Sequence, residues 1–303
     1  MTVSALLAAL NAQTVVDAIG LGAVYALMAT GIGLVFGVLR LVNFAYGQLV
    51  MAGAFALAFA SEWDWPAWAG IAFCLAVVLV LTGAMNVLVF RPLRTQSPAV
   101  MLVATFAVAF LMQSVALLWF GSLGKPATSL ASLNRPVTIG DVDIRKITIV
   151  AIVVAALFLV ALVLLLERTT IGLHMRAAAI DFATARLLGV RAERVIGTAV
   201  LISGVLAAAV AVLLTVQSPI VTPGFGLSQT IVVLAGVVVG GMNRLVSATL
   251  GGFSIGFVSG LLGGALPTGQ SQYLPSVVFG LVIVVLLVRP DGLFTRGVAG
   301  ERV

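Results

Sequence analysis

The polar side chains that could do chemistry inside this very apolar chain are few, and three of them share one short stretch. Asn43, Tyr46 and Gln48 lie where two apolar runs, 14–39 and 41–60, meet with almost no loop. Amide and phenol groups donate and accept hydrogen bonds without carrying a charge. A helix break at membrane depth is tolerated only where it is buried in protein or lines a wet cavity. We therefore expect these three side chains to line a path for a polar solute; a tight surface hairpin is the alternative.

A second break carries two glutamines. Gln217 and Gln229 stand at the two ends of QSPIVTPGFGLSQ, a stretch interrupted by proline and glycine. The apolar run beside it, 228–242, is too short for an upright membrane span, which needs about 20 residues. Both glutamines are candidates for the same path, and the alternative is a re-entrant segment that serves packing alone.

The third candidate is a charged segment, 167–194, with the sequence ERTTIGLHMRAAAIDFATARLLGVRAER. Apolar runs flank it on both sides, so it must lie in water at one face of a membrane. Residues 174–188 are expected to form a short helix that ends at a C′ glycine and docks in a groove of a separate protein. The expected docking residues are Arg176, Asp181, Phe182, Arg186, Leu187 and Gly189. The alternative is a solvated amphipathic helix on the membrane surface.

Several enzyme chemistries are missing from the sequence. It contains neither an HExxH metal motif nor a phosphate-binding GxxxxGK[ST] loop. The single cysteine, Cys74, allows no disulfide, and the single histidine, His174, has no second metal ligand near it. The interiors of the apolar runs also contain essentially none of the ionisable residues that ion-coupled transport usually needs. We therefore expect no catalytic site, metal or cofactor on this chain.

Membrane helices must position these residues. Of the 303 residues, 62% are hydrophobic and 9% are charged, whereas soluble domains carry roughly a quarter charged residues. The composition predicts an all-α polytopic membrane protein with about 8–9 membrane helices, some broken or re-entrant, in a single domain over 1–303. The apolar runs are 14–39, 41–60, 67–90, 98–120, 147–166, 195–217, 228–242, 246–266 and 273–289.

Basic residues are divided unevenly between alternate loops. Lys125, Arg135, Arg145 and Lys146 fall on one side, and the remaining 12 of the 16 basic residues fall on the other. Cytoplasmic loops carry the excess of Lys and Arg. This asymmetry predicts an external N-terminus, a cytoplasmic C-terminus, a cytosolic segment at 167–194 and an extracytoplasmic loop at 121–146.

Three stretches resemble a known family, the membrane permeases of ABC importers for branched-chain amino acids and related small polar solutes. Residues 20–55 resemble its first span and the following Asn-Phe-Ala-x-Gly segment. Residues 168–195 resemble its cytosolic coupling segment, and 232–257 together with 289–294 resemble its glycine-rich C-terminal block. The chain departs from the family pattern at Tyr46, where histidine is usual, at Gln48, where an acidic residue is frequent, and in GGMNR at 240–244.

The resemblance implies one permease subunit of an importer in the prokaryotic plasma membrane. It implies a second, related permease subunit, two ATP-binding subunits that use the ATP, and an extracytoplasmic solute-binding protein. No nucleic-acid partner is expected, because the basic residues are scattered along the membrane edges and membrane orientation explains them. The departures leave the substrate open among branched-chain amino acids, other amino acids, amides and urea. The alternatives are a stand-alone secondary transporter or channel, for which we find no coupling residues or filter, and a membrane-embedded enzyme, for which we find no catalytic set.

Overall fold

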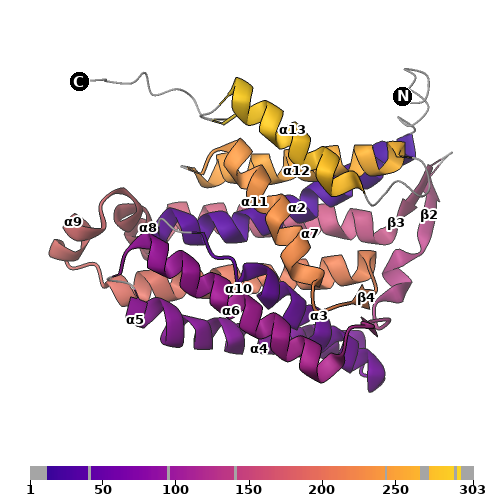
Figure 1. Cartoon of the computed structure of the whole chain (residues 1–303), viewed down its shortest axis with the longest axis horizontal. Coiled ribbons are helices and arrows are strands. Elements are labelled where there is room, and N and C mark those ends of the chain that lie inside the picture. The colour runs from indigo at the N-terminus through magenta and orange to yellow at the C-terminus, as the bar shows by residue number, and fades with distance from the viewer. Residues whose placement is uncertain are drawn as a thin grey trace.

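A computed structural model describes residues 12–39, 42–93, 96–139, 142–242, 244–266, 273–289 and 292–294. Within these ranges the chain is a helical bundle with two short antiparallel strand pairs at one end (Figure 1). The helices are α2 (Ala12–Leu39), α3 (Tyr46–Glu62), α4 (Ala67–Met85), α5 (Arg91–Leu93), α6 (Pro98–Phe120), α7 (Lys146–Arg168), α8 (Thr170–Ile180), α9 (Phe182–Leu187), α10 (Ala192–Gln217), α11 (Phe225–Gly240), α12 (Leu245–Ala265) and α13 (Leu274–Val288).

Short irregular elements complete the fold. A π-helical turn joins α4 to α5, and a 3₁₀ turn precedes the second strand pair; these are η1 (Asn86–Phe90) and η2 (Ala131–Asn134). Both strand pairs are antiparallel: β1 (Lys125–Pro126) with β4 (Ile220–Val221), and β2 (Pro136–Ile139) with β3 (Val142–Arg145). The first pair joins the segment between α10 and α11 to the segment that follows α6.

Six helices of the described part are long and apolar enough to cross a membrane: α2, α4 with its extension to α5, α6, α7, α10 and α12. Each predicted apolar run is confirmed as a helix, and 98–120 matches α6 at both ends. The start of α6 has a local cause, because the Ser97 hydroxyl accepts a hydrogen bond from the Val100 amide at 3.4 Å and Pro98 needs no donor there. Three apolar helices, α3, α11 and α13, are shorter, with 17, 16 and 15 residues.

The centre of the bundle is α2, which packs along α12 over most of its length. Glycines allow this close approach: a Cβ on Gly252 would overlap Ala29 of α2, and one on Gly256 would lie 2.8 Å from the Cβ of Tyr25. Small residues at helix interfaces allow close packing when lipid supplies no hydrophobic drive between helices. Most side chains of α6 and α7, in contrast, remain on the surface of this chain.

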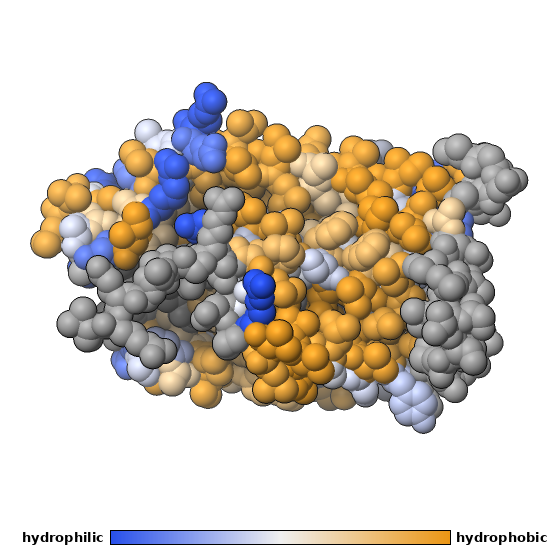
Figure 2. Space-filling model, turned by 90° about the horizontal axis from the view of Figure 1, so that it is seen from above, coloured by the Kyte–Doolittle hydropathy of each residue, from blue (hydrophilic) through white to orange (hydrophobic). Residues whose placement is uncertain are grey.

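The two ends of the bundle differ in character. In Figure 1 the strand pairs lie at one end, where α2 begins and α10 ends, whereas α8 and α9 lie at the other, where α2 and α13 end. Arg91, Arg168 and the arginines of 176–194 lie at the α8–α9 end. Figure 2 shows apolar side chains over the middle of one face and hydrophilic ones gathered toward that same end. An apolar band between polar ends is the surface that a bilayer requires.

Candidate functional site

The segment 42–45 returns into the interior of the bundle, and α3 begins there. The Tyr46 ring packs against α2 so closely that a Cβ on Gly31 would overlap its hydroxyl. Gly31 lies eight residues before the end of α2, which is about 12 Å along the helix axis. Asn43, Tyr46 and Gln48 are 2%, 0% and 0% exposed. This burial contradicts the surface hairpin and places the break in the interior of the bundle.

Local contacts hold the segment 42–45 in place. The side-chain oxygen of Asn43 accepts a hydrogen bond from the Ala45 amide at 3.1 Å, an Asx-type turn that leads into α3. The Phe44 ring meets the Phe106 ring of α6 edge-on, with centroids 5.4 Å apart. Asn43 is therefore engaged in shaping the turn, a role that the sequence reading did not assign to it.

The second break, between α10 and α11, also leads to a short helix that begins inside the bundle. After α10 ends at Gln217, the chain turns back, β4 pairs with β1, and α11 begins at Phe225. The start of α11 meets the start of α3 at two glycines: a Cβ on Gly47 would overlap Thr230 and the Gly226 carbonyl, and a Cβ on Gly226 would overlap the Gly47 carbonyl. Two short helices thus begin side by side inside the bundle. The amides of a first helical turn lack intrahelical acceptors and carry partial positive charge.

The two residues that flank Gly47 in α3 carry polar groups without partners. Within the described part of the chain, the Tyr46 hydroxyl and both amide atoms of Gln48 are buried and have no hydrogen-bond partner. The Thr230 hydroxyl, in contrast, donates to the Gly226 carbonyl at 2.7 Å. A buried polar group without a partner costs roughly 1–3 kcal/mol. We refer to Tyr46, Gln48, Thr230 and the first turns of α3 and α11 as the interior site.

The two glutamines from the second break lie elsewhere. Gln229 accepts a hydrogen bond from the Tyr25 hydroxyl and so joins α11 to α2. Gln217 lines a cavity of about 320 Å³ near the strand-bearing end, where Arg145 and Asp17 form an ion pair at 3.3 Å. The five residues expected to line one path therefore occupy four places: the turn at Asn43, the interior site, the contact between α11 and α2, and the cavity near the strand-bearing end.

The charged segment forms two helices, so the expected single helix over 174–188 is wrong. Residue Asp181 adopts an extended backbone and separates α8 from α9. Its carboxylate accepts from the Thr184 amide at 3.2 Å and from the Thr184 hydroxyl at 2.5 Å, as an N-cap of α9 does. An aspartate at this position competes with the helix for backbone hydrogen bonds, which explains the break.

The expected C′ role of Gly189 is confirmed. Its φ is +89°, the Gly189 amide donates to the Arg186 carbonyl at 3.1 Å, and the Val190 amide donates to the Ala185 carbonyl at 3.0 Å. These two bonds are the Schellman pattern. Leu187 is 88% exposed, and Arg176 and Arg186 are exposed as well. The side chain of Phe182 lies outside the described part of the structure.

Sequence reasoning missed Tyr25 and Thr230. Each lies within an apolar run, where an uncharged polar side chain is typical of an ordinary helix interior. The only available signal was the adjacency of Thr230 to Gln229. Their roles depend on contacts between segments about two hundred residues apart, which no local pattern records.

Comparisons with known proteins bear on the whole chain. Residues 14–287 match the family described as branched-chain amino acid transport system, permease component. The chain is 30% identical over 296 residues to the high-affinity branched-chain amino acid transport permease BraD of Pseudomonas aeruginosa, covering 94% of this chain and 95% of that one. It is 27% identical over 299 residues to the corresponding permease LivH of Escherichia coli, with the same coverage.

Two solved structures share the fold. One is PsaBC from Streptococcus pneumoniae in complex with Fab, with a TM-score of 0.53 at 12% identity, covering 96% of this chain and 97% of that chain. The other is an inward-facing metal-chelate-type ABC transporter, with a TM-score of 0.52 at 17% identity, covering 91% and 86%.

Proposed function

Because the chain belongs to the branched-chain amino acid transport permease family, we propose that it carries branched-chain amino acids or related small polar solutes as a permease subunit of an ATP-driven importer. It is a multi-pass protein of the prokaryotic plasma membrane. Residues 1–303 act as a single permease domain, with a cytosolic coupling segment at 167–194 and an extracytoplasmic loop at 121–146. Other amino acids, amides and urea remain within the substrate class of this proposal.

The observation that carries the proposal is the interior site. The first turns of α3 and α11 meet at Gly47 and Gly226, and two helix N-termini carry partial positive charge there, which suits the carboxylate of an amino acid. Gln48 and Tyr46 supply an amide and a hydroxyl that are buried without partners in the described part. A passing polar solute would satisfy these groups transiently, whereas a packing role would leave their desolvation uncompensated. Asn43 shapes the site, Gln229 joins α11 to α2 beside it, and Gln217 belongs to the path at the strand-bearing end.

Energy coupling is assigned to α8 and α9. The exposed side chains of Arg176, Arg186 and Leu187 at the basic end of the bundle form a surface that suits a partner protein. We place Asp181 and Gly189 in a structural role, because each fixes one end of α9. The partners are two ATP-binding subunits, a second related permease subunit and an extracytoplasmic solute-binding protein. The ATP-binding subunits hydrolyse the ATP, and this chain contributes no catalytic site.

The proposed orientation places the N-terminus outside and the C-terminus in the cytoplasm. It rests on the positive-inside rule, because the α8–α9 end carries the excess of arginine. Single cysteines at Ser132 and Leu187, in a Cys74→Ala background, test it in intact cells. An impermeant thiol reagent should label the first and spare the second, and the reverse pattern would contradict the orientation.

Uptake by the reconstituted importer tests the function. Proteoliposomes that contain this chain with its partner subunits should accumulate labelled leucine or isoleucine only when ATP and the solute-binding protein are supplied. Labelled urea and an amide, offered in parallel, identify the substrate within the class. Uptake by this chain alone, without ATP, would favour the alternative of a stand-alone transporter or channel.

A further inference from the structure

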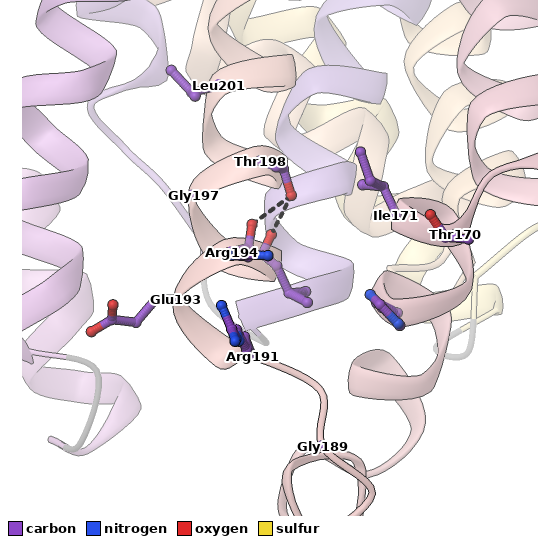
Figure 3. Close-up of a pocket in the computed structure, with 11 residues that line it drawn as sticks. Thr170, Ile171, Gly189, Arg191, Glu193, Arg194, Gly197, Thr198 and Leu201 are labelled. Carbon is purple, nitrogen blue, oxygen red and sulfur yellow. Dashed lines mark hydrogen bonds between the residues drawn. The ribbon is translucent and has the colours of Figure 1, made fainter.

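A cavity of about 650 Å³ lies between α8 and the first turns of α10, apart from the interior site. Figure 3 shows one wall of it, which is a single face of α10 and its preceding residue. Arg191, Arg194, Thr198 and Leu201 follow each other at spacings of three, four and three residues, so they share this face. The wall thus changes from charged to hydroxyl to apolar over ten residues, about 15 Å along the axis.

The opposite wall belongs to α8 and likewise combines polar and apolar side chains. Thr170, Ile171 and His174 line it, and the Ile171 side chain is 44% exposed. Two glycines also line the cavity, with open space around them. A Cβ on Gly189 would meet no atom within 4 Å, and one on Gly197 would meet only the Asn86 side-chain nitrogen, at 3.3 Å.

The charge of the cavity is positive. Glu193 also borders it, but its carboxylate pairs with Arg91 at 2.8 Å, and Figure 3 shows it pointing away from Arg191. Neither Arg191 nor Arg194 forms an ion pair with another described residue. Two exposed guanidinium groups at the polar edge of an apolar wall favour an anion that also carries a hydrocarbon part.

We propose that this α8–α10 cavity binds one anionic phospholipid. Its phosphodiester group lies between Arg191 and Arg194, beside His174, and an acyl chain follows Thr198 and Leu201 into the bilayer. A soluble phosphate would leave the apolar half of the cavity unused, whereas a phospholipid fills both halves. A lipid held there bridges α8 to α10 and so supports the segment that leads into α9. The proposal depends on the bundle lying in a bilayer and is independent of which solute is carried.

Lipid binding to the purified chain in detergent tests the proposal. Phosphatidylglycerol and phosphatidylcholine are added in turn, and bound lipid is counted by native mass spectrometry. We expect one tightly retained phosphatidylglycerol and only weak binding of phosphatidylcholine. The double variant Arg191→Gln, Arg194→Gln should weaken phosphatidylglycerol binding about 30-fold, since each basic residue near anionic lipid contributes about 5-fold.

A matched control removes the same charge outside the cavity. The double variant Arg176→Gln, Arg186→Gln should bind phosphatidylglycerol as the wild type does. Thr198→Trp keeps both cavity arginines but fills the cavity, and should also reduce binding. The Thr198 hydroxyl donates only to its own helix, to the Arg194 carbonyl at 2.7 Å and the Val195 carbonyl at 3.1 Å, so its replacement leaves no other element unpaired.

Three outcomes would overturn the proposal. Equal loss of lipid in both double variants would show a general charge effect without a site. Displacement of phosphatidylglycerol by millimolar inorganic phosphate would indicate a soluble-anion site. If Thr198→Trp binds lipid as the wild type does but loses the co-purified ATP-binding subunit, the cavity is a protein-docking surface.

Discussion

Replacing Gln48 by leucine should separate the stability of the bundle from its transport activity. The Gln48 side chain is 0% exposed, and neither of its amide atoms has a hydrogen-bond partner in the described part of the chain. A buried polar group in that state costs roughly 1–3 kcal/mol. Leucine has nearly the same size and needs no partner. We therefore expect Gln48→Leu to raise the free energy of unfolding by about 1–3 kcal/mol.

Transport should change in the opposite direction. If the Gln48 amide bonds the solute as it passes, its loss removes a neutral hydrogen bond and places an apolar side chain in a polar path. We expect uptake of leucine in proteoliposomes to fall at least about tenfold, which corresponds to about 1.4 kcal/mol. Assembly with the ATP-binding subunits should remain intact, because Gln48 lies in the interior of the bundle.

Gln229→Leu supplies the matched control. It is the same substitution in the same bundle, but the Gln229 amide oxygen accepts a hydrogen bond from the Tyr25 hydroxyl. Its loss leaves the Tyr25 hydroxyl unpaired, so the free energy of unfolding should fall by about 1–3 kcal/mol. Equilibrium unfolding in mixed micelles measures both variants. A destabilised Gln48→Leu that still transports normally would refute the reasoning, because the amide would then serve packing and not the solute.

Further predictions concern the helix contacts and the coupling segment. Gly47→Ala should prevent correct packing of α3 on α11 and lower the yield of folded protein, whereas Gly37→Ala, with open space around its Cβ, should be tolerated; size-exclusion profiles in detergent distinguish them. Asp181→Ala should destabilise α9 by about 1 kcal/mol through loss of its N-cap, and this should appear as faster amide exchange in 182–187. Gly189→Val forces a branched residue to a φ of +89° and should reduce solute-stimulated ATP hydrolysis in the assembled importer; full stimulation would show that the geometry of this turn is irrelevant to coupling.

The helices themselves could be read from the sequence. Long apolar runs bounded by proline, glycine and charge identify membrane helices because a bilayer leaves the backbone almost no other way to satisfy its hydrogen bonds. The C′ role of Gly189 could also be predicted, since helices commonly end at a glycine in the left-handed conformation. The single helix expected over 174–188 failed at Asp181, where a local side-chain cap outweighed the helical propensity of its neighbours.

The depth of the breaks was decided only by tertiary structure. The sequence showed that two apolar runs meet near Asn43 and that α11 is short, but a surface hairpin and an interior break have the same local pattern. The difference arises from the contact of Gly47 with Gly226, which brings together two helix starts that are far apart in the chain. The same long-range packing left Gln48 without a partner and gave one to Gln229. Sequence determined which amides are present, because hydropathy and turn chemistry are local properties; packing determined which of them are free to meet a solute, because hydrogen-bond satisfaction depends on residues that only the folded chain brings together.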